Sequence, residues 1–166
     1  MTEHQPVEPC AIVQADGWDG AMPAFERVLA SWLGGELPAR VGDTRASDRW
    51  LAVRIAPRRF WFIGDARSPI LPSIDHDLGS LVTLGESRLR FRLKGPLDML
   101  AACVAVDWQA EEARPGRAIQ TSLHHVPVLL LRTAADACDL LVPRTFAESL
   151  ADWLAEVVAP YQRATV

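Results

Sequence analysis

A chain of 166 residues, 49% hydrophobic and 23% charged, is long enough to bury a core without a metal ion or a disulfide to hold it together. The formal net charge of −4 excludes a general attraction to nucleic acid or to an anionic membrane. No run of about 18 apolar residues occurs, so no membrane-spanning helix is expected. The start, MTEHQPVEPC, has no signal-peptide pattern. The three cysteines, Cys10, Cys103 and Cys138, lack CxxC spacing and are expected to be buried free thiols. Together with the lack of a signal-peptide pattern, they predict a cytoplasmic protein.

The first part of the chain predicts a tail, a strand and a helix. Residues 1–9 are polar, contain two prolines and are expected to be a tail, whereas residues 10–13 predict a short strand. Pro23 can open a helix, because the N–H that it lacks would be unpaired there. Gly34-Gly35 ends this helix, and residues 36–47 are expected to be a loop. The apolar residues between recur at helical spacing: Phe25, Val28, Leu29, Trp32 and Leu33.

The middle of the chain predicts four strands. Residues 50–55 and 60–63 are joined by a short turn, and the second segment is apolar at every position, which indicates a central strand covered on both faces. After a loop over residues 64–79, residues 81–84 and 88–93 are predicted to pair as a hairpin across Gly85-Glu86.

The last part of the chain predicts a short helix after Gly95-Pro96, a charged loop over residues 107–116, two strands and a final helix. Residues 126–131 and 138–142 are apolar runs of strand length. Thr145 and Glu148 have capping-box spacing and predict where the final helix begins. Residues 161–166 are expected to be a tail. The apolar stripe of this helix comprises Phe146, Leu150, Trp153, Leu154, Val157 and Val158.

This order of elements predicts an α+β fold of mostly antiparallel sheets packed with a few helices and ending in an amphipathic C-terminal helix. We expect one domain over residues 10–160, or alternatively two packed halves over about residues 10–79 and 80–160.

No cofactor motif is present. The glycines form neither GxGxxG between a strand and a helix nor a Walker-type GxxxxGK, so no cofactor site is predicted in this chain. Ser122 and His124 could face the same side of a strand, but there is no GxSxG and no acidic residue between Gly116 and Asp136 to orient a histidine base. No catalytic residue is therefore predicted.

Two clusters could bind a metal ion. Asp75-His76-Asp77 offers two carboxylates and an imidazole, but it lacks the spaced ligands of HExxH, so we interpret it as a polar loop tip and predict no metal site. His124-His125 are neighbours in a predicted strand and would point to opposite faces, one packed and one exposed.

Four cations alternate along residues 88–94 and leave three interpretations open: phosphate contacts, a solvated face, or a rim against another subunit. These residues are Arg88, Arg90, Arg92 and Lys94. Since the net charge is negative and no nucleic-acid module is visible, nucleic acid ranks last. Trp18 and Trp108 lie in glycine-bearing or charged segments and are candidate exposed anchors at a protein interface.

Several segments resemble the gamma subunits of heterotetrameric sarcosine oxidases. DLLVPRTFAESLADWL (residues 139–154) is similar to the C-terminal signature of that family, and PGRAIQTSLHHVPVLLLR (residues 115–132) resembles the family segment before it. WLAVRIAPRRFWFIG (residues 50–64) and LRFRLKGPLDMLAACVAVD (residues 89–107) are weaker matches.

The resemblance implies a small subunit without its own cofactor, assembled with alpha, beta and delta subunits that carry FAD, FMN, NAD and tetrahydrofolate sites. It implies that the complex demethylates sarcosine to glycine, with H2O2 and, when tetrahydrofolate is present, methylene-tetrahydrofolate as products. It also implies a fold similar to the folate-binding domain of glycine-cleavage aminomethyltransferases. Those enzymes carry a catalytic aspartate where this chain has His125-Val126-Pro127-Val128, without a carboxylate.

Three hypotheses follow. The first is a non-catalytic gamma subunit with a structural role in a sarcosine oxidase complex. The second is a stand-alone folate-binding or aminomethyltransferase-like domain. The third is a nucleic-acid adaptor that uses the four alternating cations.

Overall fold

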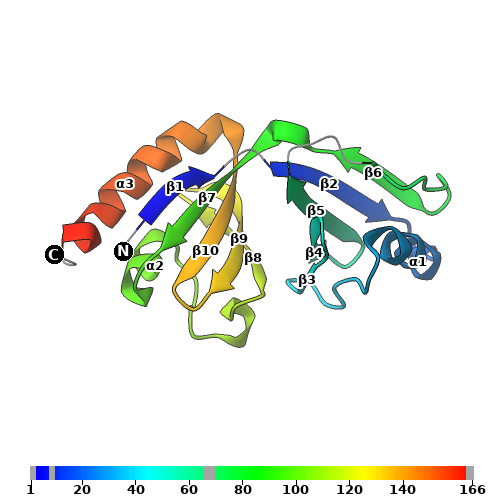
Figure 1. The fold of residues 1–166 in the computed structure, drawn as a ribbon, viewed down its shortest axis with the longest axis horizontal. Helices are drawn as coiled ribbons and strands as arrows, with labels where there is room; N and C mark the ends of the chain where they lie inside the picture. Colours follow the sequence, from blue (N-terminus) through cyan, green and yellow to red (C-terminus); the bar gives the residue numbers. More distant parts are fainter. Residues whose placement is uncertain (1–2, 8–9, 66–69, 164–166) are drawn as a thin grey trace. The chain divides into compact units, whose positions relative to one another are not determined.

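The computed structural model describes residues 3–7, 10–65 and 70–163, and it forms two compact units (Figure 1). Unit 1 comprises residues 1–9 and 87–166, and unit 2 comprises residues 10–86. Each unit contains one five-stranded antiparallel sheet. The predicted α+β class with antiparallel sheets and a C-terminal helix is therefore confirmed. None of the helices in the described ranges has the length and apolar character needed to cross a membrane.

Unit 2 has the strand order β3-β4-β5-β2-β6 and one helix, α1. Strand β5 is the middle strand, and its four apolar residues at positions 60–63 are all buried, as predicted. The elements of unit 2 are β2 (Cys10–Gly17), α1 (Met22–Leu33), β3 (Thr44–Ala46), β4 (Trp50–Ala56), β5 (Arg59–Asp65), β6 (Gly79–Thr83) and the 3-10 turn η1 (Gly85–Ser87), whose last residue begins unit 1.

Helix α1 packs one face on this sheet. Phe25, Leu29 and Leu33 are buried in a cluster with Phe60 and Phe62. The helix ends as predicted, because Gly34 takes the left-handed conformation (φ 74°) that glycine adopts without strain.

The ring of Phe25 fits where two glycines face each other across β2 and β6. Gly17 and Gly79 are paired in register. A Cβ atom on Gly17 would lie 2.7 Å from the Phe25 ring, and one on Gly79 would lie 2.5 Å from it. The two glycines therefore leave the space that seats α1 on the sheet.

Arg54 of β4 joins several segments of unit 2. Its guanidinium forms a 2.9 Å ion pair with Glu26 of α1 and donates to the carbonyls of Ala39 (3.1 Å) and Pro57. It also lies 4.8 Å from the centre of the Phe60 ring. Because one planar cation contacts the helix, a loop and a turn at once, its position fixes α1 relative to the sheet.

Unit 1 has the strand order β1-β7-β10-β9-β8. Helices α2 and α3 supply Leu100, Leu150 and Leu154 to the buried cluster that also contains Phe91 and Leu140 of the sheet. The elements are β1 (Glu3–Val7), β7 (Arg88–Lys94), α2 (Leu97–Cys103), the 3-10 turn η2 (Glu111–Ala113), β8 (Ala118–Leu123), β9 (Val126–Ala134), β10 (Ala137–Pro143), the 3-10 turn η3 (Arg144–Phe146) and α3 (Ala147–Arg163).

The predicted hairpin across Gly85-Glu86 is wrong. Strand β6 pairs with β2 in one sheet, and β7 pairs with β1 and β10 in the other. The Gly-Glu step lies in η1, where the chain passes from unit 2 to unit 1. A glycine-containing step between two strands of matching length satisfies the local hairpin signal, whereas the pairing depends on strands far away in the sequence.

Other boundaries also differ from the expectations. The segment expected to be an N-terminal tail contains β1, which pairs with β7, and residues 161–163 extend α3. Strand β3 lies within the expected loop of residues 36–47. Thr145 lies in η3, so α3 begins at Ala147, and Phe146 is 48% exposed instead of lying on the buried stripe. Residues 1–2, 8–9, 66–69 and 164–166 fall outside the described ranges.

Arg54→Ala is expected to lower the free energy of unfolding by about 2–4 kcal/mol, because Glu26 and the carbonyl groups lose a largely buried partner. Urea denaturation followed by circular dichroism measures the loss. The control, Arg40→Ala, removes an ion pair from a side chain that is 71% exposed and should cost less than about 0.5 kcal/mol. Equal effects of the two substitutions would contradict the role of Arg54.

Leu154→Ala is expected to cost about 2–5 kcal/mol, because Leu154 is fully buried between α3 and its sheet. Trp153→Ala should cost less, about 1–3 kcal/mol, because the indole is only half-buried. The same denaturation experiment ranks the two. A larger cost for Trp153→Ala than for Leu154→Ala would show that the indole is the main contact of the helix.

Candidate functional site

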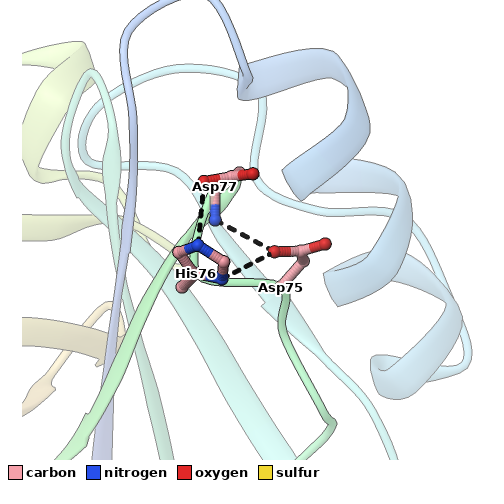
Figure 2. A group of neighbouring side chains, drawn as sticks. All are labelled: Asp75, His76 and Asp77. Carbon is pink, nitrogen blue, oxygen red and sulfur yellow. Dashed lines mark hydrogen bonds and ion pairs between the residues drawn. The ribbon is translucent and has the colours of Figure 1, made fainter.

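The Asp75-His76-Asp77 cluster lies between β5 and β6 in unit 2, and its three potential ligand atoms all lie within 4.8 Å of one another (Figure 2). The imidazole Nδ1 is 3.1 Å from Asp75 Oδ1, and Nε2 is 3.1 Å from Asp77 Oδ1. Each ring nitrogen thus faces one carboxylate, and all three side chains are exposed.

Two tryptophans hold the segment that carries this cluster. The indole N–H of Trp18 donates to the carbonyl of His76 at 2.7 Å, and that of Trp32 donates to the carbonyl of Ile70 at 3.0 Å. The backbone N–H of Trp18 also donates to the carbonyl of Leu78 at 3.0 Å. The segment of residues 70–78 is thus fixed at both of its ends. Trp18 is 45% exposed, in agreement with the expected exposure.

A hollow lies between α1 and this segment, and we call it the α1 groove. It has a volume of about 600 Å³, opens widely to solvent and is mostly apolar. Helix α1 contributes one wall, and Pro72 and Leu78 contribute the other. The lining of the groove from α1 comprises Ala24, Arg27, Val28, Ser31 and Trp32.

His124 and His125 lie in the turn between β8 and β9, and both side chains are exposed. The expectation of one packed and one exposed strand residue is therefore wrong. Both have positive φ, 45° and 67°, as a two-residue hairpin turn of this type requires, so they do not follow the alternation of a strand. The His124 ring lies edge-on to Trp153 of α3, with the ring centres 4.6 Å apart.

No hydrolytic pair forms at Ser122 and His124. Ser122 lies in β8 opposite Pro127, whereas His124 has left the strand for the turn. No hydrogen bond joins the two side chains anywhere in the described part of the chain.

All three cysteine side chains are buried, and none forms a disulfide, as expected. Burial raises the pKa of the Cys103 thiol to about 11 and that of the Cys138 thiol to about 12. Because the thiolate is the reactive form, neither thiol is a nucleophile at neutral pH.

The four alternating cations of β7 are not equivalent. Arg92 binds Asp139 of β10 through two hydrogen bonds of 2.9 and 3.2 Å, which raises the pKa of the Arg92 guanidinium. Arg90 lies 4.0 Å from the same carboxylate, whose side chain is 5% exposed. Arg88 is half-buried, and desolvation lowers its pKa. Two of the cations therefore neutralise one buried acid of their own sheet, which leaves fewer charges for phosphates.

Trp108 is buried, so the expectation that it is an exposed anchor is wrong. Its indole N–H donates to the carbonyl of Val104 at 3.1 Å, and the guanidinium carbon of Arg132 lies 4.5 Å from the centre of its ring. Arg132 is itself 5% exposed, and burial lowers its pKa. The sequence could not indicate this burial, because the covering cation lies 24 residues away in another element.

Comparisons with known proteins give consistent results. No family model matches the chain. The chain is 30% identical over 146 residues to the sarcosine oxidase subunit gamma of Corynebacterium sp. (strain U-96), and the match covers 83% of this chain and 71% of that protein. It is 29% identical over 151 residues to the sarcosine oxidase subunit gamma of an Arthrobacter species, covering 86% and 74%.

A solved structure has the same fold. One chain of the heterotetrameric sarcosine oxidase from Corynebacterium sp. U-96, solved in complex with pyrrole 2-carboxylate, matches with a TM-score of 0.77 and 22% identity. The match covers 96% of this chain and 85% of that chain. Both units of the described fold therefore have counterparts in that chain.

His125→Gly is expected to raise the free energy of unfolding by about 0.5–1 kcal/mol, because glycine adopts the positive φ of the turn without strain. Thermal denaturation measures the gain. Gly116→Ala is the matched control with the opposite sign, because Gly116 has φ 85° and no neighbour that a Cβ atom would meet. Destabilisation by His125→Gly would mean that the imidazole makes a contact worth more than the backbone strain.

Proposed function

Because this chain belongs to the family of sarcosine oxidase gamma subunits, we propose that it is a non-catalytic structural subunit of a flavin-dependent sarcosine oxidase complex. The complex demethylates sarcosine to glycine, with H2O2 and, when tetrahydrofolate is present, methylene-tetrahydrofolate as products. The observation that carries the proposal is 30% identity to a gamma subunit over 71% of its length.

The side-chain geometry supports a role without catalysis. The exposed histidines of the β8–β9 turn lack an orienting carboxylate, and Ser122 lacks a base. The thiols stay protonated because burial raises the pKa of Cys103 and Cys138. The buried charges that remain, Asp139 and Arg132, contact their own unit. These buried residues stabilise the fold and are not placed to act as an acid, base or nucleophile.

The partners are the alpha, beta and delta subunits of the complex, and the FAD, FMN, NAD and tetrahydrofolate sites belong to those subunits. The cytoplasm is the proposed location, because buried cysteines that form no disulfide suit a reducing compartment. The fold similar to the aminomethyltransferase folate-binding domain is part of the same proposal. In this chain it serves as a scaffold, since the turn at His125 replaces the position of the catalytic aspartate.

Co-expression with the other subunits tests the proposal. The isolated chain should be colourless and inactive toward sarcosine, whereas the co-expressed chain should co-elute with flavin absorbance in size-exclusion chromatography. The buried interface should exceed roughly 1,000 Å² in total, as stable complexes require.

Two outcomes would contradict the proposal. One is that the chain never joins flavin-bearing partners, and the other is that the isolated chain oxidises sarcosine. Saturable binding of tetrahydrofolate to the isolated chain in calorimetry would instead favour a stand-alone folate-binding domain. RNA retention that weakens steeply with salt would favour the nucleic-acid adaptor.

A further inference from the structure

The α1 groove carries features that the proposed function does not yet use. Its walls come from α1 and from residues 70–78, both within unit 2. We propose that it is a docking site for a partner subunit of the oxidase complex, which inserts one large apolar side chain beside Val28 and Trp32 and places an adjacent carboxylate on Arg27. This inference rests on the proposed function, because it assigns the surface through which the gamma subunit binds.

The segment that forms one wall of the α1 groove also carries a highly exposed apolar side chain, next to the lining residues. Ile70 is 85% exposed, the highest value among the exposed large hydrophobic side chains of the described residues. Its carbonyl accepts the indole hydrogen bond of Trp32, which lines the α1 groove. A second exposed large hydrophobic side chain, Trp18, is attached to the same segment through a hydrogen bond to the His76 carbonyl. An apolar side chain held in solvent on an ordered segment is typical of a surface that another protein covers.

The segment is ordered before any partner arrives. Trp18 and Trp32 each donate one indole hydrogen bond to it, and the backbone N–H of Leu78 donates to the carbonyl of Asp75 at 2.9 Å. A surface fixed in advance loses less conformational entropy on binding than a loop that must fold onto its partner. This favours rigid docking of a partner against the α1 groove.

The positive charge of Arg27 indicates which group of the partner would bind at the groove. Arg27 is exposed at the groove, and in the described part of the chain no carboxylate lies within ion-pair distance of it. The neighbouring Glu26 turns toward Arg54 instead. An arginine beside an apolar hollow binds a carboxylate through two parallel hydrogen bonds, with Ser31 one turn further along the same wall. The complementary segment is therefore a large apolar residue next to Asp or Glu.

The openness of the α1 groove argues for a protein partner. Sites for small molecules usually enclose about 70–90% of the ligand surface. This hollow opens widely to solvent, so a small ligand would stay hydrated, whereas a protein surface would close over it.

Three substitutions at exposed positions test the site. Ile70→Asp removes the exposed apolar side chain, Ser31→Trp fills the hollow without removing an apolar group, and Arg27→Glu reverses the charge. Each should weaken binding to the purified flavin-bearing subcomplex by about tenfold or more in biolayer interferometry. Arg27→Lys should retain more of the affinity than Arg27→Glu, because it keeps the charge but loses the paired hydrogen bonds.

Val41→Asp is the matched control, because Val41 is 45% exposed in the same unit but belongs neither to the groove lining nor to residues 70–78. It should change the affinity by less than about twofold. Thermal denaturation of each isolated variant verifies folding, and if Ser31→Trp fails to fold, Ile70→Asp and Arg27→Glu still decide the question.

The outcomes separate this inference from the proposed function. If the wild-type chain does not bind the flavin-bearing subunits, the proposed function is wrong. If the wild type binds and all three variants bind equally well, the chain is a subunit that docks elsewhere, and the inference is overturned. It is also overturned if the isolated wild-type chain forms a dimer that Ile70→Asp disrupts, because a second copy then occupies the site.

Discussion

The guanidinium of Arg54 is the contact on which the functional surface of unit 2 depends. Through Glu26 it fixes the side of α1 opposite the groove, and through the carbonyls of Ala39 and Pro57 it fixes the neighbouring loop and turn. The Phe25 ring, seated between Gly17 and Gly79, fixes the same helix against β2 and β6. Because α1 is held by these two independent contacts, its outer side can present Arg27 and Val28 to solvent without loss of packing.

In unit 1, too, charged side chains stabilise the fold. Asp139 is nearly enclosed, and a buried carboxylate is costly unless it is paired and hydrogen-bonded. Arg92 provides both hydrogen bonds, and Arg90 adds a second positive charge at 4.0 Å. The alternation of cations along β7, which from sequence alone suits phosphate contacts, is thus explained in part by one acid on the adjacent strand.

The sequence predicts what depends on local spacing. The all-apolar β5 and the alternation in β7 follow from periodicity and are confirmed. The stripe of α1 is confirmed at Phe25, Leu29 and Leu33, whereas Val28, expected on the same buried face, lines the α1 groove. The partner of β6, the strand β1 and the burial of Trp108 depend on segments far away in the chain, which no local pattern contains. The same holds for the candidate sites. The Asp75-His76-Asp77 cluster is visible because its members are adjacent, whereas the α1 groove joins walls that are at least 40 residues apart and needs the indole hydrogen bonds of Trp18 and Trp32.

The stretch that most resembles the gamma-subunit family, residues 139–154, is occupied by structural contacts. Asp139 pairs with Arg92, Leu150 and Leu154 fill the core under α3, and Trp153 packs against the His124 ring. These side chains are engaged in the fold, whereas Phe146 of the same stretch is 48% exposed. The resemblance to gamma subunits therefore includes residues that the fold needs, and it does not by itself locate a binding surface. The partner surface proposed above is built instead from exposed residues of unit 2, Arg27 and Ile70 beside the α1 groove.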